Sequence, residues 1–124
     1  MLEIAMHAQC IDLKERFGRR FRVAYEESYR ASYGLHATRK DPWLQVLLCR
    51  YGHIYTFGGE RLAASVDGHA NVAGVLRRLP CCTVHQDGDL GELTVVFNVA
   101  DFAKVAKIMQ PRRSRRLSPQ AREA

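Results

Sequence analysis

Residues 43–66, WLQVLLCRYGHIYTFGGERLAASV, contain three short runs of strand-forming residues separated by two turns. RYG divides WLQVLLC from HIYTF, and GGE divides HIYTF from RLAASV. The Gly58-Gly59 pair can adopt the positive φ angles that a tight hairpin requires, and runs rich in Val, Ile, Thr and aromatic residues are typical of strands. This stretch therefore predicts a three-stranded antiparallel meander.

Helical and strand patterns continue on both sides of the meander. The clearest helix pattern lies in residues 101–110, where Phe102, Val105, Ala106 and Met109 recur at the spacing of one helix face. Further helices are expected in residues 10–18 and 67–80, and further strands in residues 19–28, 81–86 and 92–99. Hairpin-connected strands combined with helices predict an α+β fold. We expect a small single domain with a mainly antiparallel sheet of about five or six strands and about two or three helices packed on one face.

The basic residues are unevenly distributed along the chain. The 124 residues carry 19 Lys and Arg against 13 Asp and Glu, a net charge of +6. Residues 111–124 hold five arginines and one glutamate, hence +4, which leaves 14 basic and 12 acidic residues, hence +2, in residues 1–110. Pro111 ends the preceding helix pattern because its ring cannot continue a helix. We therefore expect an α+β domain in residues 1–110 and a disordered basic C-terminal tail in residues 111–124.

Two short runs of arginine contain seven of the 19 basic residues. They are Arg112, Arg113, Arg115 and Arg116 in the tail, and Arg19, Arg20 and Arg22 after the first expected helix. Arginine binds phosphate through paired hydrogen bonds, so clustered arginines are typical of a segment that contacts a nucleic-acid backbone. We expect a small non-enzymatic protein that binds nucleic-acid phosphates, or another anionic partner, through these side chains. No helix with base-reading side chains on one face is evident, so sequence-specific readout is not expected.

A protein partner is the main alternative. A sheet edge or a helix face can dock on another protein, and the arginine tail is then incidental. The meander also carries Tyr51, Tyr55 and Phe57 beside Arg50 and His53, and such aromatic side chains can stack bases on a sheet face. The competing interpretation is that they pack against neighbouring strands.

Two Cys/His pairs make a zinc site a third hypothesis. Cys49 and His53 are four residues apart, and Cys82 and His85 are three apart. Structural zinc takes four Cys or His ligands in a tetrahedron, so the pairs can form one site if their strands meet. The protein would then be a small zinc protein or a metal-dependent enzyme. The spacing matches no standard zinc motif, and a strand cysteine is usually an apolar core residue, so no cofactor is expected.

A group of carboxylates follows in HQDGDLGE, residues 85–92. Asp87, Asp89 and Glu92 lie near His85 in the sequence, and such a group can hold Mg²⁺ for phosphodiester chemistry. Asp and Gly are also the residues that a hairpin turn needs, and a turn is the role expected here.

The cellular setting is inferred from what the sequence lacks. The first residues contain no apolar run of signal-peptide length, and no run approaches the roughly 18 apolar residues of a membrane span. Four cysteines, Cys10, Cys49, Cys81 and Cys82, are compatible with free thiols in a reducing compartment. We expect a cytoplasmic protein with no membrane partner.

Overall fold

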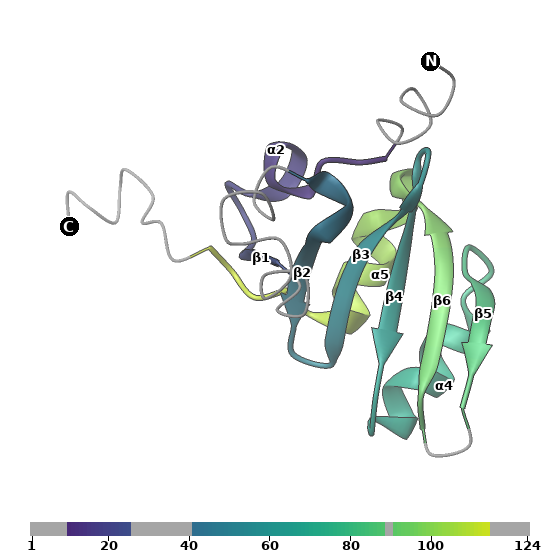
Figure 1. The fold of residues 1–124 in the computed structure, drawn as a ribbon. Coiled ribbons are helices and arrows are strands. Elements are labelled where there is room, and N and C mark those ends of the chain that lie inside the picture. Colours follow the sequence, from purple (N-terminus) through teal and green to yellow (C-terminus); the bar gives the residue numbers. More distant parts are fainter. Residues whose placement is uncertain (1–9, 26–40, 89–90, 115–124) are drawn as a thin grey trace.

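The computed structural model describes residues 10–25, 41–88 and 91–114 (Figure 1). These residues form one antiparallel sheet of six strands with three α-helices, which confirms the expected α+β fold. The strands are β1 (Val23–Tyr25), β2 (Gln45–Cys49), β3 (Gly52–Gly58), β4 (Arg61–Val66), β5 (Thr83–Asp87) and β6 (Leu93–Asn98). The helices are α2 (Leu13–Phe17), α4 (Ala70–Arg78) and α5 (Phe102–Met109), with 3₁₀ turns at η1 (Pro42–Leu44) and η2 (Val99–Asp101).

The strands pair antiparallel in the order β1-β2-β3-β4-β6-β5. Strands β2, β3 and β4 are the predicted meander. After β4 the chain leaves the sheet through α4 and returns as β5 at the far edge, and β6 fills the place between β4 and β5. The turn between β3 and β4 uses the predicted glycines, with φ of 118° at Gly58 and 59° at Gly59.

The first strand of the meander begins later than the sequence predicts. Trp43 and Leu44 belong to η1 and not to β2, which starts at Gln45. The carboxylate of Asp41 accepts a hydrogen bond from the backbone N–H of Trp43 at 3.0 Å, and Pro42 occupies the first position of the turn. Local capping by an Asp-Pro pair therefore overrides the strand preference of the tryptophan.

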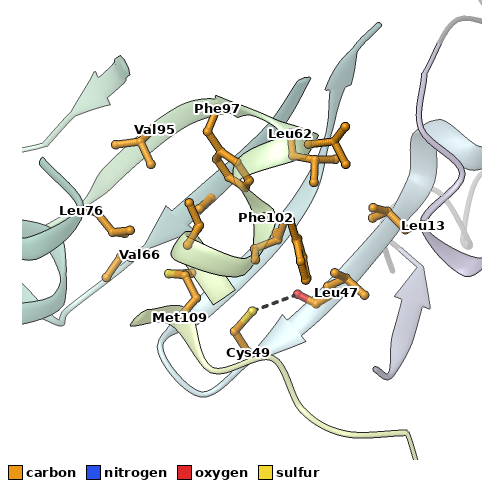
Figure 2. Packing of buried hydrophobic residues seen from close by; sticks show 14 of the residues in the cluster. Leu13, Leu47, Cys49, Leu62, Val66, Leu76, Val95, Phe97, Phe102 and Met109 are labelled. Atoms are coloured by element: carbon orange, nitrogen blue, oxygen red, sulfur yellow. Dashed lines mark hydrogen bonds between the residues drawn. The ribbon is translucent and has the colours of Figure 1, made fainter. Parts of the chain in front are cut away.

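One face of the sheet is buried beneath the helices. Figure 1 shows α4 and α5 behind the sheet, and Figure 2 shows the apolar side chains that meet there. Along β4, Leu62, Ala64 and Val66 point into this cluster, as the two-residue period of a strand requires. The buried residues of α5 are Phe102, Val105 and Met109, which follow the predicted helical pattern. Within the described residues, no helix is long and apolar enough to cross a membrane.

A buried glutamine ties the short helix α2 to the sheet. Gln45 is 3% exposed, and its Oε1 accepts a hydrogen bond from the backbone N–H of Leu13 at 2.7 Å. Its Nε2 donates to Oδ1 of Asp12 at 2.9 Å, and the same oxygen caps α2 by accepting from the N–H of Glu15. A helix of five residues has little stability of its own, so these bonds and the burial of Phe17 hold it in place.

The chain after α5 returns to the edge of β2. Gln110 ends the helix in the left-handed conformation, with φ of 57°, and Pro111 follows. The backbone N–H of Arg50 donates to the carbonyl of Gln110 at 2.9 Å, and the N–H of Arg112 donates to the carbonyl of Leu48 at 2.8 Å. Pairing with this segment satisfies backbone groups at the end of β2, beyond the last residue that β1 pairs with.

The same segment then pairs with the residues that precede β1. The N–H of Arg22 donates to the carbonyl of Arg112 at 2.8 Å, and the N–H of Ser114 donates to the carbonyl of Arg20 at 3.0 Å. Residues 111–114, which the sequence assigned to the tail, are therefore hydrogen-bonded to the domain. Residues 115–124 lie outside the described residues, and so does the predicted disorder there.

Candidate nucleic-acid interface

The two predicted arginine runs meet at this junction. The described members form the arginine cluster, which consists of Arg19, Arg20, Arg22, Arg112 and Arg113. An antiparallel bridge between Phe21 and Arg113 joins the two runs, and opposed residues in such a pair lie about 5 Å apart. Arg115 and Arg116 lie outside the described residues.

The cluster is fixed to the hydrophobic core through Phe21. The ring of Phe21 packs on Phe102, with 5.7 Å between ring centroids, and Phe102 stacks on Phe17 at 4.1 Å. The guanidinium of Arg20 lies over the ring of Phe21 at 5.1 Å. The backbone that carries the arginines is thus anchored to a residue from α5 and a residue from α2.

The charge of the cluster is not neutralised by carboxylates in the described part of the chain. The salt bridges among the described residues join Arg77 to Asp87 and Lys104 to Asp101, and neither involves the cluster. Four of the five arginines are exposed, and Arg22 is half-buried with its Nε out of contact with water. A group of positive charges without carboxylate partners attracts anions.

The face of the sheet opposite the helices, the open face, carries aromatic and polar side chains. His53, Tyr55 and Phe57 alternate along β3 with residues that point into the core. The rings of His53 and Tyr55 stack with 5.4 Å between centroids, and the hydroxyl of Ser65 donates to Oη of Tyr55 at 3.3 Å. The three described helices all contribute their buried side chains to the other face. The open face therefore presents half-exposed rings that no described helix covers.

The other two residues of the predicted stacking group lie elsewhere. Tyr51 is in the turn between β2 and β3 and packs edge-on against His69, which precedes α4, at 5.2 Å. The guanidinium of Arg50 lies over the ring of Tyr51, also at 5.2 Å. Sequence reasoning did not include Arg61, whose guanidinium lies over the ring of Phe57 at 5.0 Å. Arg61 pairs with Gly58 across the hairpin, next to a register shift between Thr56 and Gly58 that no local sequence pattern predicts.

The four residues of the zinc hypothesis are not brought together. Cys49 points into the core, where its thiol donates to the carbonyl of Leu47 at 3.6 Å (Figure 2), whereas His53 lies on the open face. The ring of His85, on β5, contacts the ring of Phe57 on the open face. Zinc ligands must lie within about 2.3 Å of the ion, and Cys49 and His53, on opposite faces of the sheet, are not placed to share one. Within the described residues no group of three or more His, Cys, Asp and Glu is placed to hold a metal ion.

The thiols and the carboxylate near His85 have structural partners. Burial, with a further contribution from the neighbouring Cys81, raises the pKa of Cys82 to about 12, the opposite of an activated nucleophile. The Arg77 guanidinium hydrogen-bonds Asp87 and lowers the pKa of that carboxyl, with Nη2 at 2.9 Å from Oδ1. This pair joins α4 to β5. Asp89, the other aspartate of the predicted magnesium group, lies outside the described residues.

Comparison of the chain with family models, curated proteins and solved structures finds no match. Function is therefore inferred from the residues of this chain alone.

Proposed function

We propose that the protein binds nucleic acid by contacts between phosphates and the arginine cluster. The observation that carries the proposal is the backbone pairing of residues 112–114 with residues 20–22. It brings the backbones of arginines from opposite ends of the sequence side by side, and four of the five arginines are exposed. Each phosphate contacted by a Lys or Arg releases condensed counterions, so the interaction depends strongly on salt and weakly on base sequence.

Pre-organisation supports this proposal over a merely solvated run of charge. A free arginine segment must be ordered when it binds, and that ordering opposes binding. The backbone of Arg112 is already held by hydrogen bonds to Leu48 and to Arg22, and Arg113 lies opposite Phe21 in an antiparallel bridge. The preceding run is fixed through Phe21 on the core. Part of the ordering is thus complete before a ligand arrives.

Fluorescence anisotropy with a labelled DNA duplex, over about 50 to 200 mM salt, tests the proposal. The double substitution Arg20→Gln/Arg112→Gln removes one arginine from each run. We expect weaker binding at low salt, and the slope of log K against log salt should flatten by up to about 1.8 if two phosphate contacts are lost.

The matched control is Arg78→Gln/Lys104→Gln. It removes the same net charge from α4 and α5, where both side chains are exposed on the helical side of the molecule. The control should keep the original slope. Equal losses in the two variants would mean that only net charge matters, and absence of binding in the unaltered protein would contradict the proposal directly.

A protein partner is the second candidate, and one feature favours it. β5 is an edge strand whose five residues are all exposed, with Val84 41% exposed. Such an edge can accept a strand from another protein. Failure of the duplex titration together with the single-strand titration below would favour this candidate.

A further inference from the structure

A hollow of about 280 Å³ lies where β3, β4, β5 and β6 come together on the open face. Among the residues that line it are Phe57, Arg61, Thr83, His85, Val96 and Asn98. Val96 is the last residue of β6 that pairs with β5, so the hollow extends past the start of β5. Its size is near the lower limit of about 300 Å³ for small-molecule pockets, which suits one planar ring system.

The walls of the hollow are aromatic and cationic. The rings of Phe57 and His85 meet edge to face, with 4.9 Å between centroids and 78° between planes. The guanidinium of Arg61 lies over the ring of Phe57, 5.0 Å from its centroid. Aromatic rings and guanidinium planes are the surfaces on which unpaired bases stack. No acidic side chain is found among the described residues that line the hollow.

Hydrogen-bond donors dominate the polar groups of the hollow. The Oδ1 of Asn98 accepts from the backbone N–H of Ala100 at 2.8 Å, which commits the amide oxygen to capping η2. The amide NH₂ group of Asn98 is left as a donor, and the guanidinium of Arg61 offers only donors. A ligand with acceptors at the edge of a planar ring, such as the carbonyl oxygens and ring nitrogens of a nucleobase, matches this set.

The hollow and the arginine cluster are connected across the open face. Arg112 lies beside Leu48, and Leu48 pairs with His53 on β3. Phe57 is four residues further along the same strand. Two strand spacings and four residues of strand correspond to about 16 Å between the cluster and the hollow, and the stacked His53 and Tyr55 rings lie between them.

We propose that the open face binds single-stranded nucleic acid, with one base in the hollow and the backbone directed to the arginine cluster. This rests on the proposed function, and it names the ligand class. The bases of a duplex are paired and stacked on one another, so their faces are not available to Phe57 or His85. The hollow therefore contributes to single-strand binding and not to duplex binding.

The test compares a labelled oligothymidylate of about twelve nucleotides, within the usual site size of single-strand binders, with a duplex of equal length. His85→Ala and Phe57→Leu each remove a stacking surface. The affinity for the oligothymidylate should fall by about 5- to 100-fold, as expected for the loss of one stacked base, and the affinity for the duplex should stay unchanged. His69→Ala is the matched control, because His69 is an exposed histidine beside Tyr51 near α4.

The outcomes separate this inference from the proposed function. If single-strand binding depends on Arg20 and Arg112 but not on His85 or Phe57, the inference fails and phosphate binding remains. If it depends on His85 and Phe57 but not on the two arginines, the hollow is a base site and the arginine proposal fails. His85 lies on an edge strand, so its variant should keep the unaltered melting temperature even if Phe57→Leu does not.

Discussion

The hydrogen bonds of Gln45 give the sharpest prediction about the stability of the fold. The substitution Gln45→Met keeps the length of the side chain but removes both of its polar groups. The N–H of Leu13 then loses its 2.7 Å partner in a buried position, and Asp12 loses a donor. An unsatisfied buried donor costs about 1–3 kcal/mol, and loss of the second, partly exposed bond adds about 0.5–1.5 kcal/mol. We expect the free energy of unfolding to fall by about 1.5–4.5 kcal/mol.

Urea unfolding followed by circular dichroism measures this loss, and the matched control is Gln86→Met. Gln86 lies on the edge strand β5 and is exposed, so the same chemical change there should leave the midpoint almost unaltered. For a domain of this size each 1 kcal/mol corresponds to about 4–8 °C in the melting temperature. Equal midpoints for Gln45→Met and the unaltered protein would refute the role assigned to the glutamine in holding α2.

Two further predictions concern the C-terminal junction and the buried thiol. In urea unfolding, a chain that ends at Gln110 should be less stable than one that ends at Ser114 by about 1–3 kcal/mol. The shorter chain lacks three backbone hydrogen bonds, and part of their loss is offset because residues 111–114 no longer have to be ordered on folding. Equal midpoints would contradict this. Burial raises the pKa of Cys49 from 9.0 to about 12, so above pH 9 the unfolded state loses a proton that the folded state keeps, and stability falls as the pH rises towards 12. Between about pH 9 and pH 10 the Cys49 thiol alone should lower the free energy of unfolding by about 1 kcal/mol. The difference in urea midpoint between the unaltered protein and Cys49→Ala should therefore shrink over this range. A difference that stays constant would refute the prediction.

The meander could be predicted because its turns and strands are specified locally. Gly58 and Gly59 have the positive φ angles that their placement between two strand-like runs required. Phe102, Val105 and Met109 likewise face the core because a single period of 3.6 residues describes their helix. In both cases neighbouring residues contain the whole signal.

The junction of the arginine runs could not be predicted in the same way. It depends on Arg112 pairing with Leu48 and with Arg22, residues far away in the sequence that present unpaired backbone groups. Backbone hydrogen bonding is nearly independent of side-chain identity, so no residue pattern predicts which segment pairs with the exposed edge of β2. The composition of residues 111–114 therefore indicated a solvated tail where the fold supplies a partner.

The separation of Cys49 from His53 has a related cause. The four-residue spacing placed Cys49 and His53 in one hypothetical site, but the two-residue turn at Arg50 and Tyr51 pairs Cys49 with Gly52 and Leu48 with His53. Opposed residues in an antiparallel pair share a face, so His53 lies on the face of Leu48 and away from Cys49. The length of the turn sets the register of β2 and β3, and the register determines which residues share a face of the sheet.

The distance between the arginine cluster and the hollow restricts the ligand that can use both. A free phosphate or a mononucleotide is too small to span about 16 Å, so it can occupy one site at a time. A strand of several nucleotides can contact both sites. Once one site is occupied, the second contact forms at a high effective concentration, so the combined affinity exceeds the affinity of either site alone. Arg112 and His85 belong to sites far enough apart that their contributions to the free energy of binding such a strand should be additive. If the proposed phosphate contacts at the sheet edge and the proposed base stacking on the open face both occur, the ligand is a flexible polyanion with exposed rings, and single-stranded nucleic acid is the polymer with that chemistry.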